Sequence, residues 1–537
     1  MRFVDVLNVL SKSSPYAVST EKQPSDSQKL DEIKDYLYIE TQIEKDFRSL
    51  LNHSSEKKII FLCGSSGDGK SEIMTKYSQD PIYSHVDFHL DATHSFNPRL
   101  DAIATLDNIF DAYKASERTL AVGINLGMMA KYANMGAARH SDIKDAMHRH
   151  RQKNNASGNI EFLSFEDQKY AKFFFKDGKP YSDFASSFMR NLTNPSCEHH
   201  INPIWDAMLE AEEADESPIV ITNFRLLSME SVQSTIIELL MKARLAKDQF
   251  LTARAFLDFI HTLLVSDTFL FDSLFLSRNS ELTDKLASFD PALLRTERLD
   301  NLALTLKLNL PEDDLFKFKV QLKEIGVDSL SSSASYIRLF YTLRYASLGN
   351  DYHLKYVKEF DDRLLADYSN VLLAHQNYKG ENSEREKSII NNFYKHVLFT
   401  ALWRYINRGA PELKSKQFLV AKENDVLFAT ELKLLIDWTA IESYESEDLM
   451  SFSTFIKVNK QTLKSMMPVN INLFELLQRL NLGYRPNKYD KNCVLLLDEL
   501  VEQVKSEMAK SDTLIIIDEK TSYEAENDGG LIEITER

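Results

Sequence analysis

The chain has 537 residues, of which 43% are hydrophobic, and at about 150 residues per domain this is enough for several domains with sizeable cores. Acidic residues outnumber basic ones by 80 to 64, giving a formal net charge of −16. A polyanion would therefore be repelled on average, and any contact with nucleic acid must be local or supplied by another subunit. The sequence has no apolar run of about 18 residues and no signal-peptide pattern, so we expect a cytoplasmic protein that neither spans a membrane nor is secreted. The three cysteines are too few and too scattered for a disulfide framework or a zinc site.

The first half of the chain predicts an α/β fold. Residues 1–27 end in a stretch rich in Ser, Pro and Gln, which is typical of a flexible leader. Apolar positions at helical spacing predict one amphipathic helix over residues 30–51. Short apolar, β-prone runs then alternate with helical stretches, and this alternation predicts a parallel sheet covered on both faces. The expected strands are 59–63, 86–90, 120–125, 160–165 and 219–222.

The most informative pattern follows the first of these strands and has the form G-x-x-x-x-G-K-[ST]. It reads Gly64, Ser65, Ser66, Gly67, Asp68, Gly69, Lys70 and Ser71, followed by Glu72. In such a loop, the glycines let backbone N–H groups converge on phosphates, the lysine reaches the outer phosphates, and the Ser hydroxyl can bind Mg²⁺. Residues 72–77 favour a helix, whose N-terminus would attract an anion. The pattern therefore predicts a nucleotide phosphate site over residues 64–72; the alternative is a Gly-rich turn that binds no ligand.

Hydrolysis of a bound nucleotide requires a carboxylate that holds the metal ion and a polar group that orients water. Asp91 follows the expected strand 86–90, where ligands of open α/β sheets bind, so we assign it with Ser71 to the metal. Asn125 follows the next strand and could contact the γ-phosphate or hold a water. The alternatives are a helix cap or turn residue for Asp91 and a turn residue for Asn125. Two apolar runs that end in Asp-Glu, at 494–499 and 514–519, lie in an amphipathic helix and in the terminal segment, and neither is assigned to the site.

Arg254 is the second residue after Thr252, a residue type that caps helices. In the additional-strand ATPases, a helical lid presents an arginine at such a position to the γ-phosphate, and Arg254 resembles that arginine. The alternative is a surface arginine that pairs with Asp258 four residues later. Arg225 is a weaker candidate for an arginine that neutralises the charge of the nucleotide phosphates.

The rest of the chain predicts mainly helices. From about residue 231 to residue 480 the pattern is almost wholly helical. Residues 483–537 predict a helix followed by a hairpin, with strands at 514–517 and 531–534 and a turn signal at 527–530. The fold class that we expect is an α/β P-loop NTPase core with a parallel sheet and an AAA+-like helical lid. A large, mostly helical region and a small α+β segment follow. The corresponding boundaries are 1–27, 28–275, 276–482 and 483–537.

Two other clusters carry weaker signals. Cys197, Glu198, His199 and His200 could bind a metal, but adjacent residues on one loop rarely close a tetrahedron. The densest basic stretch contains Arg149, Arg151 and Lys153, and it favours either a local contact with DNA or a solvated helix end. Neither a nuclease motif nor a catalytic triad can be argued from the sequence.

Several strings resemble the DptF (DndF) family of DNA phosphorothioation-dependent restriction proteins over most of the chain. These strings are residues 64–72, 90–98, 120–127, 247–255 and 483–487. The resemblance implies a bacterial protein similar to P-loop ATPases that binds ATP and Mg²⁺. It also implies partners of the DptG and DptH kinds, in a complex that attacks DNA lacking the phosphorothioate mark. Gly64, Gly69, Lys70 and Ser71 match the loop positions of such ATPases.

Three functions remain open at this point. The first is an ATPase subunit of that defence complex, and the second is a nucleotide-binding interaction module that does not hydrolyse ATP. The third is a small-molecule kinase, which the long helical region disfavours because kinases with this loop are usually compact. The sequence has no Asp-Glu pair at the end of a strand beside the loop, so it leaves open whether ATP is hydrolysed.

Overall fold

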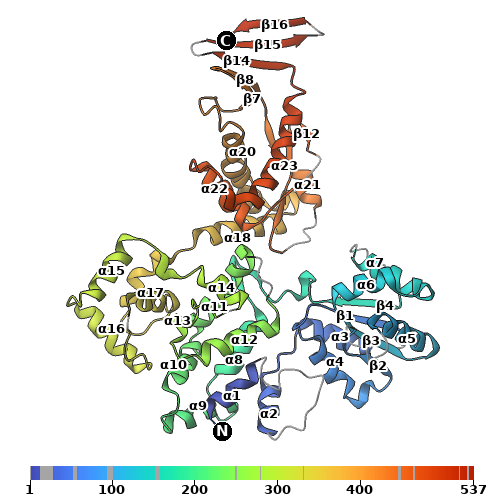
Figure 1. Cartoon of the computed structure of the whole chain (residues 1–537), viewed down its shortest axis with the longest axis vertical. Coiled ribbons are helices and arrows are strands. Elements are labelled where there is room, and N and C mark those ends of the chain that lie inside the picture. Colours follow the sequence, from blue (N-terminus) through green and yellow to red (C-terminus); the bar gives the residue numbers. More distant parts are fainter. Residues whose placement is uncertain are drawn as a thin grey trace. The chain divides into compact units, whose positions relative to one another are not determined.

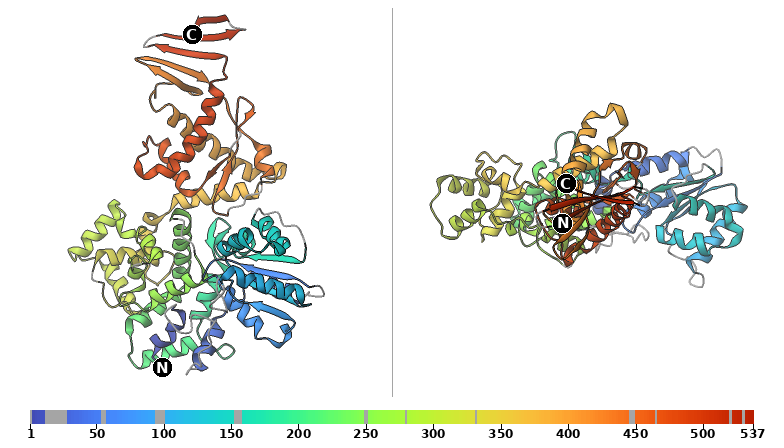
Figure 2. Two further views of the ribbon diagram at one scale, coloured as in Figure 1. Left: turned by 45° about the vertical axis from the view of Figure 1, so that its right-hand side comes forward. Right: turned by 90° about the horizontal axis from the view of Figure 1, so that it is seen from above.

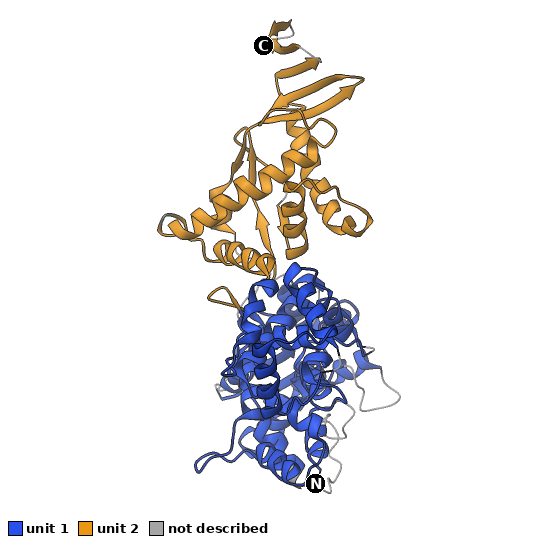
Figure 3. Cartoon of the chain, turned by 90° about the vertical axis from the view of Figure 1, so that its left-hand side faces the viewer, with its two compact units in different colours: residues 1–174, 180–361 blue, residues 175–179, 362–537 orange. Residues whose placement is uncertain are grey.

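A computed structural model describes most of the chain (Figure 1). The described residues are 2–11, 28–52, 57–92, 101–151, 158–247, 251–278, 280–330, 332–444, 449–463, 466–518, 521–528 and 531–537. They form two compact units (Figure 3): unit 1 is Met1–Phe174 with Pro180–Asp361, and unit 2 is Phe175–Lys179 with Asp362–Arg537. Neither of the predicted domain boundaries at residues 275 and 482 lies at this division, and the finer partition into four segments stays a prediction.

Unit 1 contains a four-stranded parallel sheet with the strand order β2-β3-β1-β4. The strands are β1 (Ile59–Cys63), β2 (Val86–His89), β3 (Thr119–Ile124) and β4 (Ile160–Ser164). Every residue of the central strand β1 is buried, as expected for a short apolar run inside a parallel sheet. These four strands confirm the predicted parallel sheet.

Helices cover both faces of this sheet (Figure 1). Because side chains alternate along a strand, Ile59, Phe61 and Cys63 face one side and Ile60 and Leu62 the other. The first side packs against α5 (Ala102–Ala115), α6 (Leu126–Met135) and α7 (Ser141–Arg151). The second packs against α3 (Gln42–Asn52) and α4 (Lys70–Ser78).

The segment before the sheet differs from the prediction in two ways. Residues 30–51 form two helices, α2 (Gln28–Leu37) and α3, instead of one. Part of the expected flexible leader is folded, because α1 (Phe3–Leu7) buries Phe3 against Phe224 with ring centroids 5.3 Å apart. Residues 12–27 of that leader lie outside the described residues.

The remainder of unit 1 is helical. It contains α8 (Asp183–Thr193), α9 (Pro203–Glu213), α10 (Pro218–Leu227), α11 (Glu230–Lys247), α12 (Ala253–Leu264), α13 (Leu270–Ser273), α14 (Glu281–Ala287), α15 (Glu297–Lys307), α16 (Asp313–Glu324) and α17 (Ser333–Thr342). The strand predicted at 219–222 was wrong, because these residues lie in α10. Pro218 opens this helix, where a missing N–H costs nothing. Burial of the apolar side chains that follow it overrides their β propensity.

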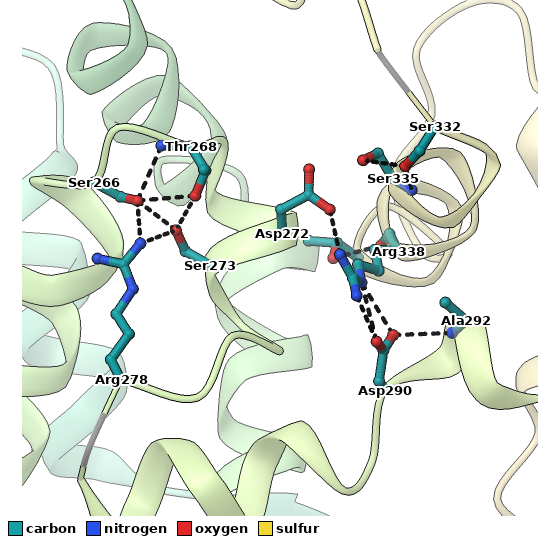
Figure 4. Close-up of polar contacts among 11 residues, drawn as sticks. Ser266, Thr268, Asp272, Ser273, Arg278, Asp290, Ala292, Ser332, Ser335 and Arg338 are labelled. Carbon is teal, nitrogen blue, oxygen red and sulfur yellow. Dashed lines mark hydrogen bonds and ion pairs between the residues drawn. The ribbon is translucent and has the colours of Figure 1, made fainter.

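Charged side chains hold part of this helical body together (Figure 4). The guanidinium of Arg338 on α17 donates hydrogen bonds to Asp272 on α13, at 2.9 Å, and to Asp290, at 2.6 Å. Both carboxylates lie largely inside the protein, and their hydrogen bonds raise the pKa of Arg338. The arginine therefore stays charged and links α17 to α13 and to the segment at Asp290, which are separated from it by other helices in the chain.

Unit 2 combines helices with antiparallel strands. Its helices are α18 (Arg363–Asn377), α19 (Glu384–Asn392), α20 (Phe399–Ile406), α21 (Trp438–Ser443), α22 (Ile471–Asn481) and α23 (Lys491–Met508). Its largest sheet has the order β16-β15-β14-β8-β7, from β7 (Gln417–Glu423), β8 (Val426–Glu431), β14 (Thr513–Asp518), β15 (Thr521–Asp528) and β16 (Leu531–Glu536). Smaller sheets pair β10 (Phe452–Thr454) with β13 (Met467–Val469), and β11 (Ile456–Val458) with β9 (Leu434–Ile436) and β12 (Gln461–Thr462). A short hairpin, β5 (Phe174–Lys176) and β6 (Lys179–Tyr181), spans the division between the units.

The expectation of an almost wholly helical stretch from 231 to 480 was therefore wrong where strands β7 to β13 lie, between residues 417 and 469. A turn signal was present, because Asn424 adopts φ 53° between β7 and β8, and Asn tolerates this left-handed conformation. The two strands expected in the terminal hairpin are present as β14 and β16, but they do not pair with each other, because β15 lies between them and pairs with both. No helix within the described ranges is long and apolar enough to cross a bilayer.

Candidate functional site

Residues 64–71 lie at the carboxyl edge of the parallel sheet: residues 64–69 connect the end of β1 to α4, and Lys70 and Ser71 are the first two residues of α4. Backbone hydrogen bonds join the segments that leave the four strands. Gly64 donates to Ile124 at 3.2 Å, Phe165 to Cys63 at 2.9 Å, and Ala92 to Gly123 at 2.8 Å. The loop, the end of β2, the end of β3 and the end of β4 are thus held together at one edge.

The loop backbone has the conformation that its glycines allow. Gly67 adopts φ +86° and Gly69 adopts φ +104°, a region that L side chains rarely occupy. Gly69 is the N-cap of α4 and supplies no side-chain cap. The first N–H groups of α4 have no partner within the helix, and with the helix dipole they favour an anion at this end.

Lys70 lies across the loop. Its Nζ donates hydrogen bonds to the carbonyl oxygens of Gly64, at 2.8 Å, and Ser65, at 2.7 Å. Burial lowers the pKa of Lys70, while the carboxylates of Asp68 and Asp91 act in the opposite direction. The ammonium group is thus partly withdrawn from water and held by carbonyls that an anionic ligand could replace.

Asp68, predicted among the nucleotide-binding residues, uses both carboxylate oxygens inside the protein. One oxygen accepts a hydrogen bond from the Ser65 amide at 2.7 Å, and the other pairs with Lys172 Nζ at 2.9 Å. The side chains of Asp68 and Lys172 are 3% and 10% exposed. Lys172 also lies over the ring of Phe165, 4.7 Å from its centroid. The structure therefore shows Asp68 bracing the loop, and sequence reasoning missed Lys172 because no local pattern links it to the loop.

Arg254 lies next to the loop, and its predicted contact with the γ-phosphate stays a prediction. Its backbone N–H donates to the carbonyl oxygen of Gly67 at 3.0 Å, and Thr252 caps α12 by accepting from the Ala255 amide at 3.1 Å. A Cβ added at Gly67 would lie 2.9 Å from the Cβ of Arg254. The loop and the start of α12 are therefore in direct contact, although residues 248–250 of the predicted string lie outside the described residues.

The predicted hydrolytic residues lie at the same edge. Strand β3 separates β1 from β2, so Asp91 follows a strand that is not adjacent to β1, yet its charge acts on Lys70. Asn125 is the N-cap of α6, where its Oδ1 accepts from the Met128 amide at 2.6 Å. The cap uses one lone pair of the oxygen, and the Nδ2 donor takes no part in it. Ser71 occupies the first turn of α4, and Glu72 forms an ion pair with Lys34 at 3.4 Å.

Two further carboxylates, Glu166 and Asp167, lie at this edge. They were not predicted as site residues from the sequence. They follow β4, which is hydrogen-bonded directly to β1. Burial raises the pKa of Glu166, and the charges of Asp68 and Asp167 add to this effect. The signal was available, because an acid pair directly follows the predicted strand 160–165.

The remaining candidates do not join this edge. Arg225 on α10 donates to Glu212 on α9 at 2.6 Å, and this pairing accounts for its charge. His200 contacts the hydroxyl of Tyr36 at 2.9 Å, and no group of three or more potential metal ligands occurs among the residues that the structure describes. Arg149 and Arg151 lie in the last turn of α7, while Lys153 is outside the described residues. The two late Asp-Glu strings belong to unit 2, the first on α23 and the second at the end of β14, where Asp518 is described and residue 519 is not.

Comparisons with protein-family models, curated proteins and solved structures give no match.

Proposed function

We propose that this chain is the ATP-binding and ATP-hydrolysing subunit of a bacterial complex for DNA phosphorothioation-dependent restriction, acting on unmodified DNA with DptG-like and DptH-like partners. The nucleotide part of the proposal is supported by the loop geometry. The restriction part is supported by the sequence strings that resemble the DptF family, and the acidic net charge of −16 fits a subunit that docks on other proteins.

One observation carries the nucleotide part: Lys70 and the N-terminus of α4 converge on a loop with two glycines at positive φ. The residues present fit a triphosphate, because the backbone N–H groups of the loop and of the first helical turn can donate to phosphate oxygens. Lys70 Nζ can exchange its two carbonyl acceptors for phosphate oxygens of higher charge. Ser71 can offer its hydroxyl to Mg²⁺, with Asp91 or Glu166 as the carboxylate. Bound Mg²⁺-ATP would supply the scissile phosphoanhydride and a charge-neutralising cation.

The contact between Gly67 and Arg254 gives this site a way to influence the rest of unit 1. Arg254 lies in the first turn of α12, and its backbone N–H is hydrogen-bonded to the loop. A change in loop conformation or charge would therefore act on the start of α12 directly. We infer that α12 responds to the nucleotide state.

Calorimetry tests nucleotide binding. We expect heat of binding when Mg²⁺-ATP is titrated into the folded full-length chain, and a loss of about tenfold or more in affinity for Lys70→Ala, which removes the cation. Lys34→Ala is the matched control, because it removes a nearby cation that pairs with Glu72 and lies outside the loop. If wild-type protein, alone and with its partners, releases no heat with any nucleoside triphosphate, the proposal is wrong.

Turnover distinguishes the competing functions. An ATPase releases phosphate faster than its Lys70→Ala variant, in the presence or absence of partners and DNA. Equal rates would favour the non-hydrolysing module, and ADP formation with phosphate transferred to an acceptor other than water would favour a kinase. In cells, Lys70→Ala and Arg254→Ala should both reduce restriction of unmarked plasmid DNA, with Arg254→Ala sparing nucleotide binding more than Lys70→Ala.

A further inference from the structure

The outer edge of the large sheet in unit 2 is open. Strands β15 and β16 extend past the helices of this unit (Figures 1 and 2), and all six residues of β16 are exposed. The nearest core cluster includes Ile515 of β14 but no residue of β15 or β16. Within the described residues, β16 pairs with β15 on one side and with no strand on the other. Edges of this kind readily add another strand.

One face of this edge is largely apolar. Its apolar residues come from β8, β14, β15 and β16: Phe428, Leu514, Ile516, Tyr523, Ala525, Ile532 and Ile534. Two polar residues share this face, Asn527 opposite Ile532 and Glu536 opposite Tyr523. None of the apolar residues is buried, and Ile532 and Ile534 are 71% and 60% exposed. The opposite face packs Ile515 into the core of unit 2, so the apolar face is additional to that core. Exposed β-branched residues on a regular edge strand are a liability unless a partner covers them.

The other face of the same two strands is acidic. Glu526 of β15 lies directly opposite Glu533 of β16, and Glu524 is the next residue on this face of β15. Arg537 pairs with Glu431 at 2.8 Å and reaches Glu524 at 3.7 Å. Like charges directly opposite each other destabilise a sheet, so the pair of Glu526 and Glu533 would be stabilised by an added cation.

The two edges of this sheet differ. At the opposite edge, β7 carries a register irregularity between Leu419 and Ala421, and such a bulge hinders the addition of a strand. The pairing of β16 with β15 is continuous from Leu531 to Glu536. The regular edge is therefore the one that also has an apolar face and an acidic face.

We propose that β16 binds an extended segment of a partner protein in which apolar and basic side chains alternate. The segment adds a strand next to β16, its apolar side chains extending the face of Ile532 and Ile534 and its basic side chains lying beside Glu533 and Glu526. A second copy of β16 fits this edge less well, because it would bring its own Glu533 and Glu536 to an acidic strand. The proposal does not depend on nucleotide binding, so either one can fail without the other.

Peptide binding to the full-length chain tests this surface. The probes are labelled peptides as long as β16: one alternating Ile and Lys, one alternating Ile and Glu, and one with the composition of the first in scrambled order. We expect fluorescence anisotropy to show binding of the Ile/Lys peptide only, and hydrogen exchange to show protection of the β16 amides in its presence. Equal binding of the Ile/Glu or the scrambled peptide, or no protection of β16, would overturn the proposal.

Charge variants sharpen the test. The double variant Glu526→Gln/Glu533→Gln should weaken binding of the Ile/Lys peptide by about tenfold. Glu423→Gln, on β7 at the opposite edge, is the matched control and should leave binding unchanged. All three side chains are exposed, so circular dichroism should report wild-type folding. If sedimentation instead shows a dimer that Ile534→Lys dissociates, the occupant of the edge is a second copy and the proposal fails.

Discussion

The amide of Arg254 donates a hydrogen bond to the carbonyl oxygen of Gly67 across 3.0 Å, which ties the first turn of α12 to the centre of the glycine-rich loop. The approach is close enough that a Cβ on Gly67 would lie 2.9 Å from the Arg254 Cβ and 3.1 Å from the Thr252 hydroxyl. Gly67 therefore serves two purposes, since it permits the turn of the loop and makes room for α12.

This double role separates Gly67→Ala from Gly69→Ala. Both place an alanine at positive φ, at a cost of about 1–2 kcal/mol of strain. At Gly69 the added Cβ meets nothing within 4 Å, while at Gly67 it collides with α12, which should add about 1–3 kcal/mol. Urea unfolding measures the two costs, and hydrogen exchange over residues 253–264 should rise only in Gly67→Ala. Equal costs with unchanged exchange would show that the loop does not brace α12.

The ion pair of Asp68 and Lys172 should show strong coupling. Asp68→Asn and Lys172→Met each leave one charge largely inside the protein without its partner, which costs about 3–5 kcal/mol. The double variant removes both charges and should cost clearly less than the sum of the single changes, as measured by urea unfolding.

Lys169→Met is the control for this cycle, because Lys169 is 61% exposed and its ion pair with Asp46 should contribute less than about 1 kcal/mol. If the stability losses of Asp68→Asn and Lys172→Met add up in the double variant, the ion pair does not hold the loop. Lys172 would then contact Asp68 without stabilising the fold.

The carboxylate that holds Mg²⁺ can be identified by two isosteric changes. We expect Asp91→Asn to raise the Mg²⁺ concentration needed for half-maximal ATP turnover by about tenfold or more. Glu166→Gln, at the end of β4, should leave this requirement nearly unchanged, because Asp91 is the carboxylate whose charge acts on Lys70, whereas Glu166 lies near the like charges of Asp68 and Asp167. The reverse result would assign the metal to Glu166.

Asn125 can be tested for a role beyond capping. Asn125→Ala removes the cap of α6 and should cost about 1 kcal/mol of stability in thermal or urea unfolding. Asn125→Ser retains a capping oxygen and should keep most of that stability while losing the Nδ2 donor. If Asn125 orients water or contacts the γ-phosphate, both variants lose ATP turnover. Normal turnover in Asn125→Ser would show that the residue only caps the helix.

His375 should make unit 2 sensitive to acid. Burial lowers its pKa to about 4; its Nδ1 bonds to the Val371 carbonyl at 2.9 Å, and its ring stacks on Phe452 at 4.3 Å between centroids. Between pH 6.5 and about pH 4 the unfolded chain binds a proton that the folded chain does not. Stability should therefore fall as the pH falls through this window, by up to about 3 kcal/mol, and level off below it.

The measurement for His375 is the free energy of unfolding as a function of pH. His375→Phe should flatten the curve in this window, whereas His396→Phe, at an exposed position, should not. An unchanged slope in His375→Phe would assign the acid sensitivity of unit 2 to other groups.

The elements near the loop were predictable because their signals are local. The apolar run 59–63 is followed at once by glycines, a lysine and a serine. Each of these residue types influences the backbone conformation or the ligand chemistry of a few neighbouring positions. Where burial by distant elements decides the conformation, the prediction failed. Residues 219–222 are β-prone by composition, yet packing on several sides makes them part of α10. Strands β7 to β13 lie between residues 417 and 469, and the partner of β8 is β14, far along the chain.

By itself, the sequence determined the loop, the four strands of the parallel sheet and the position of Arg254 at the start of a helix. Only the tertiary structure decided that Arg254 contacts Gly67, that Lys172 pairs with Asp68 across 104 residues, and that Glu166 stands at the same edge as Asp91. The physical reason is range: backbone conformation and helix capping depend on neighbouring residues, whereas an ion pair or a close approach depends on how whole elements pack.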